Sequence, residues 1–299
     1  MNYLIIITGP TGIGKTNLSV KLAQKFNTEI ISADSRQIYK EMSIGTAVPS
    51  PKELKLVRHH FIQNISIHEY YNVSRYENEA ISVIGELHKK NKFVILTGGT
   101  GLYINAICKG IDLMPDPDPE IRQKLNRTFE KNGIISLQKQ LQILDPEYYK
   151  SVDLNNPARL IRALEICIQT NRTYSSFRKT KDKVRNFKTI KIALNMKREL
   201  LYERINKRVI SMVNEGLIKE AKLLYSHRNL TALKTVGYQE LFDAFDGKHS
   251  IEEGVKYIQN SSRRYARKQI SWIRRDSEYQ WFNPKQIEEI THYIESKLD

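Results

Sequence analysis

The chain has 299 residues, of which 40% are hydrophobic and 27% are charged, a composition typical of a globular protein with one large domain or two. No apolar run is long enough for a membrane span or signal peptide, and Cys108 and Cys167 have no metal-ligand spacing, so we expect a cytoplasmic protein with reduced thiols and no zinc site. Lys and Arg number 48 against 33 acidic residues, and this formal charge of +15 indicates a polyanionic partner, either nucleic acid or an anionic membrane surface.

Short apolar runs alternate with helical patterns over the first 110 residues. The runs predict strands at 3–8, 29–32 and 93–97, and the patterns predict helices at 15–26 and 76–90. Such alternation favours an α/β fold with a parallel sheet covered on both faces.

The alternation stops after Gly110. The segment Met114-Pro115-Asp116-Pro117-Asp118-Pro119 is a helix-breaking connector, and helices are predicted beyond it at 120–132, 136–144 and 157–170. A strand at 190–195 and helices at 199–225 and 251–273 follow. Residues 112–187 are therefore predicted to be a helical insertion in an α/β core formed by residues 1–111 and 188–299.

A phosphate-binding pattern lies between the first predicted strand and helix. The sequence GPTGIGKT fits G-x-x-x-x-G-K-[ST], in which glycines let successive backbone N–H groups point at one anion, as in a P-loop NTPase-like core. The helix N-terminus adds partial positive charge, Lys15 neutralises phosphate oxygens, and the Thr16 hydroxyl is a candidate Mg²⁺ ligand. The predicted phosphate-binding residues are Gly9, Pro10, Thr11, Gly12, Ile13, Gly14, Lys15 and Thr16.

The pattern does not identify the molecule that carries the phosphate. NTPases usually have a second strand ending in Asp, whereas the run at 93–97 leads into Gly98-Gly99-Thr100-Gly101. A carboxylate instead follows the run at 29–32, as Asp34. Residues just past the ends of parallel strands line the ligand crevice, so Asp34 and Thr100 are expected to face the phosphate. The alternatives are an N-cap role for Asp34 and a turn role for Thr100.

Motifs spread along the chain resemble the tRNA dimethylallyltransferases, or tRNA isopentenyltransferase family, of the bacterial type. After GPTGIGKT come Asp34-Ser35-Arg36-Gln37-Ile38-Tyr39, Ile44-Gly45-Thr46-Ala47, His59-His60, Gly98-Gly99-Thr100-Gly101-Leu102-Tyr103, Arg159-Leu160-Ile161-Arg162-Ala163-Leu164-Glu165, Gly237-Tyr238-Gln239-Glu240 and Arg264-Tyr265-Ala266-Arg267-Lys268-Gln269. Gln63 stands where the family commonly has Asp.

The resemblance implies transfer of a dimethylallyl group from dimethylallyl diphosphate to N6 of the adenosine 3′-adjacent to the tRNA anticodon. Asp34 would accept the amine proton and Thr100 would orient the amine, while the phosphate loop, Arg208 and Mg²⁺ bound through Thr16 would hold the diphosphate. The residues implied to contact tRNA are Asp34, Ser35, Arg36, Gln37, Thr100, Arg122, Ala158, Arg159, Leu160, Ile161 and Arg162.

Two basic segments are candidate RNA-binding surfaces, although charge runs are often only solvated faces. The first, at 171–191, carries Arg172, Arg178, Lys179, Lys181, Lys183, Arg185, Lys188 and Lys191. The second, on the predicted helix at 251–273 and just after it, carries Arg263, Arg264, Arg267, Lys268, Arg274 and Arg275.

Two other functions remain possible from the residues alone. A P-loop small-molecule or nucleoside kinase explains the phosphate loop but not the charge, and it would consume ATP. An RNA-binding ATP switch would bind RNA without forming a covalent product. We expect a monomer with no membrane partner.

Overall fold

The computed structural model describes residues 1–178 and 182–298, so Lys179 and Lys181 of the first basic segment lie outside the described residues. The chain forms two compact units, one of residues 1–108 and 185–299 and one of residues 109–184. These bounds fall within three residues of those predicted for the core and the insertion. No helix in the described part of the chain is long and apolar enough to cross a membrane.

The core unit contains a sheet of six strands, and the sheet is parallel, as the sequence predicts. The strands are β1 (Tyr3–Thr8), β2 (Ile30–Ser32), β3 (His59–His60), β4 (Phe93–Gly98), β5 (Lys188–Leu194) and β6 (Gln280–Phe282), in the order β3-β2-β4-β1-β5-β6. The two edge strands were not predicted, because β3 consists of two histidines and β6 of Gln-Trp-Phe, so neither forms an aliphatic run like that of β2.

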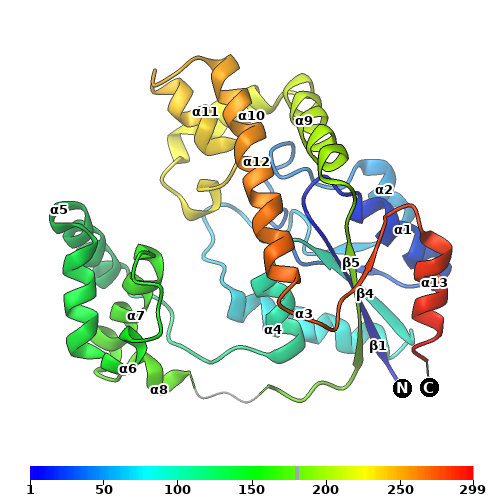
Figure 1. Ribbon diagram of the computed structural model, residues 1–299, viewed down its shortest axis with the longest axis horizontal. Helices are drawn as coiled ribbons and strands as arrows, with labels where there is room; N and C mark the ends of the chain where they lie inside the picture. Colours follow the sequence, from blue (N-terminus) through cyan, green and yellow to red (C-terminus); the bar gives the residue numbers. More distant parts are fainter. Residues whose placement is uncertain (179–181, 299) are drawn as a thin grey trace. The chain divides into compact units, whose positions relative to one another are not determined.

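Helices cover both faces of the sheet, so every residue of β1 is buried. On one face, Leu4 and Ile6 pack with α3 (Val73–His88) and α4 (Gly101–Lys109). On the other, Ile5 and Ile7 pack with α1 (Lys15–Lys25) and α13 (Ile287–Glu295) (Figure 1). This burial explains why β1 is a continuous apolar run.

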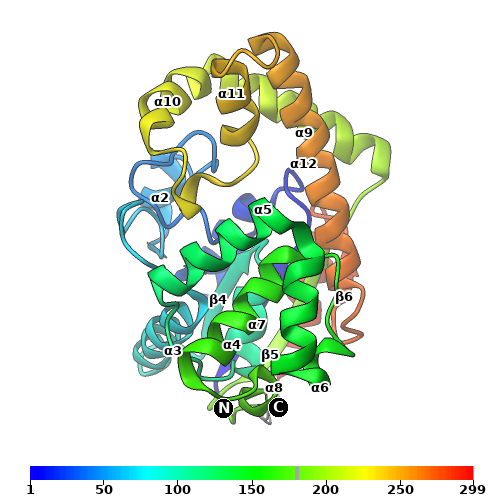
Figure 2. The same cartoon turned by 90° about the vertical axis from the view of Figure 1, so that its left-hand side faces the viewer.

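Four further helices of the core unit pack against one another: α9 (Arg198–Asn214), α10 (Leu217–Leu224), α11 (Tyr238–Phe245) and α12 (Ile251–Ile273) (Figure 2). Short elements are α2 (Pro51–Leu56) and the 3₁₀ turns Tyr225–His227 and Thr231–Leu233. The single helix predicted at 199–225 is wrong. Gly216 has φ 110°, a left-handed value that favours glycine, and it separates α9 from α10.

The second unit is helical and has its own apolar cluster around Leu125, Leu141 and Leu164. It contains α5 (Pro119–Leu144), α6 (Pro146–Tyr149), α7 (Pro157–Thr170) and α8 (Tyr174–Phe177). The two helices predicted at 120–132 and 136–144 form the single element α5, which is kinked at Gly133 with φ 69°. The non-helical backbone at Gly133 divides α5 into two helical segments, so the two predicted helices are confirmed.

Candidate active site

The phosphate loop, residues 9–16, connects β1 with the first turn of α1. Gly12 and Gly14 have φ values of 80° and 104°, which glycine adopts without strain, and α1 begins at Lys15. The Lys15 ammonium donates hydrogen bonds to the carbonyl oxygens of Gly9 and Pro10, at 2.9 and 3.1 Å. The loop thus holds its own lysine beside the backbone that would surround an anion.

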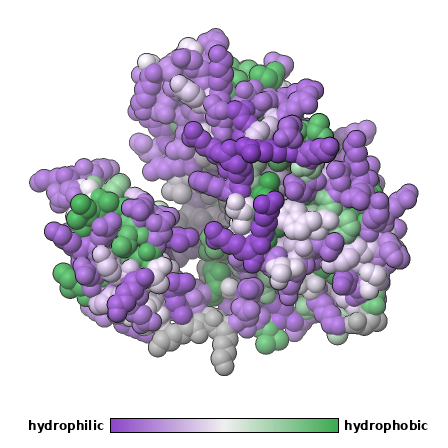
Figure 3. All heavy atoms as spheres, in the orientation of Figure 1, coloured by the Kyte–Doolittle hydropathy of each residue, from purple (hydrophilic) through white to green (hydrophobic). Residues whose placement is uncertain are grey.

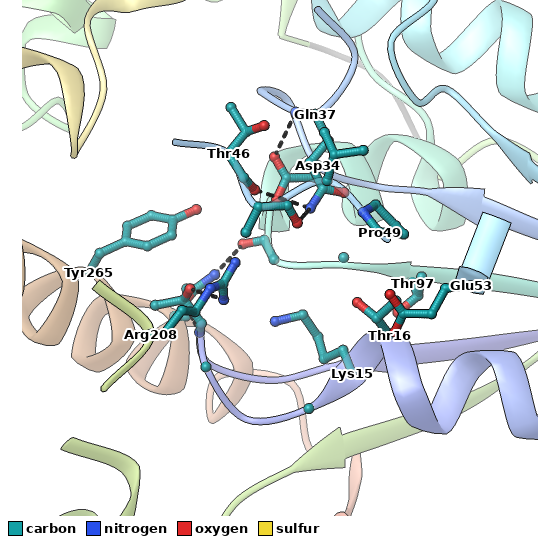
Figure 4. A pocket seen from close by; sticks show the side chains of 18 of the residues that line it. Lys15, Thr16, Asp34, Gln37, Thr46, Pro49, Glu53, Thr97, Arg208 and Tyr265 are labelled. Carbon is teal, nitrogen blue, oxygen red and sulfur yellow. Dashed lines mark hydrogen bonds between the residues drawn. The ribbon is translucent and has the colours of Figure 1, made fainter. Parts of the chain in front are cut away.

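A cavity of about 310 Å³ opens over this loop. Figure 4 shows Lys15, Asp34 and Arg208 around it, with Thr16, Thr97 and Glu53 at one side. A second cavity, of about 400 Å³, is lined by Ser35, Arg36 and residues of α9 and the 234–239 segment. Both cavities are lined by Thr11, Asp34, Thr46, Arg208 and Tyr265, so they adjoin.

Two partly desolvated cations face the first cavity. Burial, and then the positive charge of Arg208, lower the pKa of Lys15 to about 8, although Asp34 acts in the opposite direction. Burial also lowers the pKa of Arg208. Arg208 donates to the Thr11 hydroxyl at 3.2 Å, and Arg204, one turn earlier, donates to the Gly12 carbonyl at 3.0 Å. A bound anion would relieve the cost of placing these cations together.

Asp34 follows β2 and faces both cavities. Its Oδ1 accepts hydrogen bonds from the backbone N–H groups of Arg36 (2.9 Å) and Gln37 (3.3 Å). This is the capping geometry considered above as an alternative. Because a carboxylate has a second oxygen, capping and a position at the cavity wall occur together in one side chain.

Thr100 follows β4 and is bound to the turn that carries Asp34. Its hydroxyl accepts a hydrogen bond from the Ser35 N–H at 3.0 Å and donates to Ser35 Oγ at 3.3 Å, while its N–H donates to the Ala33 carbonyl at 3.1 Å. The preceding residues, Gly98 and Gly99, line the cavity. The turns that follow β2 and β4, which were expected to meet beside the phosphate loop, are thus joined by hydrogen bonds.

Two residues of α12 that had no assigned role also build this site. The Gln269 amide accepts a hydrogen bond from the Thr11 N–H at 2.8 Å and donates to the Gly99 carbonyl at 3.1 Å, so it joins the phosphate loop to the β4 turn. Tyr265 points into the cavity from α12 (Figure 4). Burial raises its pKa to about 12. Both lie in the quoted motif at 264–269, which is the only sequence signal for them.

The residues implied to contact tRNA fall into two groups. In the core unit, Ser35 and Arg36 line the second cavity, and Gln37 lines the first. In the helical unit, Ala158 and Arg159 are exposed, whereas Leu160 and Ile161 are buried in the apolar cluster and their side chains are unavailable to RNA.

Arg122 and Arg162 of the helical unit are engaged internally. Both guanidinium groups bind the fully buried carboxylate of Glu165, and Arg122 does so with two nitrogens. These ion pairs neutralise the buried charge of Glu165. Both arginines therefore have a structural role in the helical unit, in addition to any contact with tRNA.

The first basic segment is partly a structural feature. Arg185 forms an ion pair with the buried Glu77 at 2.6 Å and donates to the carbonyl oxygens of Ala106 and Ile107 at the end of α4. Lys191 is buried on β5 and donates to Asp276 at 2.7 Å and Glu278 at 2.5 Å. The interpretation of these two cations as RNA-binding groups is therefore wrong, since acids distant in sequence neutralise them.

The second basic segment divides between two faces of α12. Arg263 faces α9, where it donates to Asn206 Oδ1 at 2.5 Å. A groove of about 520 Å³ on the helix is lined by Arg264, Arg267, Lys268, Ser271, Trp272 and Arg275. Figure 3 shows hydrophilic side chains over α12 on the face of the molecule that it draws. The groove residues form an exposed basic surface, in which Arg267 also donates to the Tyr202 hydroxyl at 3.4 Å.

Comparison with known proteins gives one consistent result. Residues 37–276 match the sequence model of the family described as IPP transferase, a match that begins just after the phosphate loop and Asp34. A tRNA dimethylallyltransferase of Christiangramia forsetii is 54% identical over 299 residues, covering 100% of this chain and 99% of the relative.

Solved structures agree. The tRNA isopentenylpyrophosphate transferase of Bacillus halodurans has a TM-score of 0.73 at 36% identity, covering 99% of this chain and 97% of that one. A eukaryotic dimethylallyltransferase captured acting on tRNA has a TM-score of 0.74 at 28% identity, covering 91% of this chain and 70% of that one. With a phosphate loop, a strand-end carboxylate and full-length similarity to these enzymes, the chain belongs to the IPP transferase family, the family of the tRNA dimethylallyltransferases.

Proposed function

We propose that this enzyme transfers a dimethylallyl group from dimethylallyl diphosphate to N6 of the adenosine 3′-adjacent to the anticodon of tRNA. The observation that carries the proposal is the pair of adjoining cavities that share Asp34, one of them lined by a phosphate loop with two desolvated cations. A diphosphate donor fits the first cavity and an extruded base fits the second, so the two reacting groups would meet at Asp34.

The reaction breaks the C1–O bond of the allylic diphosphate and forms a bond between C1 and N6 of adenine. Carbon develops carbocation character and the departing diphosphate gains negative charge. The N–H groups of the phosphate loop, Lys15 and Arg208 stabilise that charge where it forms. Pro10 has no N–H, so its part in the loop is conformational.

Mg²⁺ is the metal that fits this chemistry. Thr16, Thr97 and Glu53 bring hydroxyl and carboxylate oxygens to one side of the first cavity, and oxygen ligands suit this hard cation. Thr16 would hold the ion. When bound, Mg²⁺ would neutralise further charge on the diphosphate.

Asp34 supplies the proton acceptor. The exocyclic amine of adenine is a weak nucleophile because its lone pair is delocalised into the ring, so removing a proton as the C–N bond forms assists the attack. The Arg36 and Gln37 N–H groups fix the carboxylate through Oδ1. Thr100, hydrogen bonded to Ser35, would orient the amine.

The adenine must leave the stacked anticodon loop to reach Asp34. Ser35 and Arg36 would contact the extruded nucleotide in the second cavity. The exposed Ala158 and Arg159 of the helical unit, and the basic residues of the α12 groove, would contact other parts of the tRNA. We infer that the enzyme acts as a monomer in the cytoplasm, where its tRNA substrate is found.

Mass analysis of tRNA after incubation with dimethylallyl diphosphate tests the proposal. We expect one adenosine beside the anticodon to gain a dimethylallyl group, with release of one diphosphate. A kinase would instead consume ATP, so turnover of ATP on a small molecule, with no change in tRNA mass, would contradict the proposal.

A further inference from the structure

A carboxylate on α10 holds a tight turn in the wall of the active site. In the turn at residues 43–47, the first three N–H groups point in one direction, as at the start of a helix. Glu220 accepts all three: Oε2 from Ser43 (3.0 Å) and Ile44 (2.8 Å), and Oε1 from Gly45 (2.8 Å). Oε1 also accepts from the Tyr238 hydroxyl at 2.7 Å.

The four contacts require a group that only accepts. Both carboxylate oxygens face N–H or O–H donors, so a glutamine at this position would turn an NH₂ group against other donors. Charge-assisted hydrogen bonds of this kind are stronger than neutral ones. The turn also packs closely, since a side chain at Gly45 would come within 2.5 Å of the Tyr238 ring.

The other end of the turn continues to the proposed base. The carbonyl oxygens of Thr46 and Ala47 accept hydrogen bonds from the Gln37 amide, at 3.2 and 2.9 Å (Figure 4). The backbone N–H of Gln37 in turn donates to Asp34 Oδ1 at 3.3 Å. Hydrogen bonds at both ends of the turn, joined by the turn's own backbone and by Gln37, therefore connect Glu220 with Asp34.

We propose that Glu220 is a positioning residue for dimethylallyl transfer, which fixes the turn at 43–47 and, through Gln37, the carboxylate of Asp34. The inference rests on the proposed role of Asp34 as proton acceptor. Glu220 itself lines neither cavity, so it acts on the geometry of the reacting groups and not on the substrates.

The test compares Glu220→Gln with Glu203→Gln, a control that removes an exposed carboxylate of α9 paired with Lys207. Single-turnover prenylation of tRNA is measured at saturating dimethylallyl diphosphate, and binding of inorganic diphosphate is measured separately. Glu220→Gln is expected to lower the single-turnover rate about 10- to 100-fold, since small misplacements of reacting groups have effects of this size. Diphosphate affinity should fall by much less than the rate, because the phosphate loop and Lys15 are not part of this connection, although Thr46 and Ala47 of the turn line the first cavity.

Tyr238→Phe removes one of the four contacts and should lower the rate in the same direction by a smaller factor, which keeps the test decisive if Glu220→Gln folds poorly. A rate for both variants within twofold of the Glu203→Gln control would overturn the proposal. A loss of diphosphate affinity as large as the loss of rate would also overturn it. Such a result would mean that the variant disorders the whole site and not only the geometry at Asp34.

Combination with Asp34→Asn separates this inference from the proposed function. If Glu220 acts through Asp34, adding Glu220→Gln to Asp34→Asn should lower the rate no further. An additional loss equal to that in the wild-type background would refute action through Asp34. An unchanged rate for Asp34→Asn alone would instead contradict the role of Asp34 as the base.

Discussion

Lys15 shows how the fold changes the chemistry of a single residue. Exposed lysines remain charged well above neutral pH, but burial and the nearby Arg208 lower the pKa of this ammonium to about 8. The group is thus charged at neutral pH and becomes neutral as the pH rises above 8. A bound diphosphate favours the charged form, so binding of the anion and protonation of Lys15 are coupled.

This coupling predicts a pH dependence of diphosphate affinity. Above pH 8 the dissociation constant of inorganic diphosphate should rise by up to about tenfold per pH unit, because Lys15 must take up a proton on binding. Isothermal titration calorimetry at pH 7, 8 and 9 measures this. Lys15→Met keeps an unbranched side chain one atom shorter and removes the charge, so it controls for the ionisation of diphosphate itself. This variant should bind diphosphate more weakly and lack the additional pH dependence. Equal pH profiles for the two proteins would contradict the coupling.

Asp34→Asn separates the capping role of this side chain from its proposed role as the base. Asparagine keeps Oδ1, so the hydrogen bonds from Arg36 and Gln37 and the thermal stability should be retained. Loss of the proton acceptor should lower single-turnover prenylation about 10²- to 10⁴-fold. Quench-flow measurements with circular dichroism as the control for folding provide the comparison. A folded variant with an unchanged rate would show that a group other than Asp34 accepts the proton.

At the scale of elements, α12 serves two purposes. Its buried side presents Gln269 to the phosphate loop, and an exposed side carries the basic groove. From Gly254 to Arg275 the sequence contains no acidic residue. The positive charge of the groove is therefore not neutralised within the helix, and it is available to a polyanion.

Charge neutralisation in this groove should weaken tRNA binding. Changing Arg264, Lys268 and Arg275 together to Gln should reduce the slope of log K against log salt by about 2 to 3, because fewer counterions are released. Filter binding at several salt concentrations measures the slope, and affinity for inorganic diphosphate should stay the same. A matched control changes three exposed lysines outside α12, Lys21, Lys90 and Lys285, to Gln. Equal slopes for the two triple variants would make the groove an ordinary solvated surface.

At the scale of the whole molecule, the chain has two units with separate interiors. The helical unit encloses its own apolar cluster and the buried Glu165, which Arg122 and Arg162 neutralise. The core unit contains the sheet and both cavities. Stability of the helical unit and ligand binding by the core are therefore expected to respond to different substitutions.

Glu165→Gln tests this separation. The change leaves two arginines without their anionic partner, and we expect a loss of roughly 2 kcal/mol from the helical unit, less than for a fully enclosed pair because both guanidinium groups are partly exposed. Thermal unfolding and limited proteolysis between residues 109 and 184 measure the loss. Diphosphate affinity should match that of the wild-type protein. A weaker diphosphate site in this variant would show that the two units are energetically coupled.

Local sequence was sufficient for the central elements of this protein. The bounds of β1, α7 and α12 follow from residues 3–8, 157–170 and 251–273 themselves, because a continuous apolar run or an amphipathic period belongs to one segment of chain. The phosphate loop is likewise local, since its glycines and Lys15 are neighbours. The ordered motifs, each also made of neighbouring residues, indicate the family.

Tertiary structure alone decided which side chains complete the site. Glu220 binds a turn about 176 residues earlier in the chain, and Gln269 joins two loops that precede it by 170 residues or more. Lys191 and Arg185 are basic in sequence, yet folding brings acids to each of them. A hydrophobic pattern shows which side of a segment is buried. It does not show which distant segment packs there, and that packing sets the partner of each polar group. That is why the sequence by itself determined the four central strands, the phosphate loop and the family, and why the positioning contacts and the exposed basic groove were decided only by the folded chain.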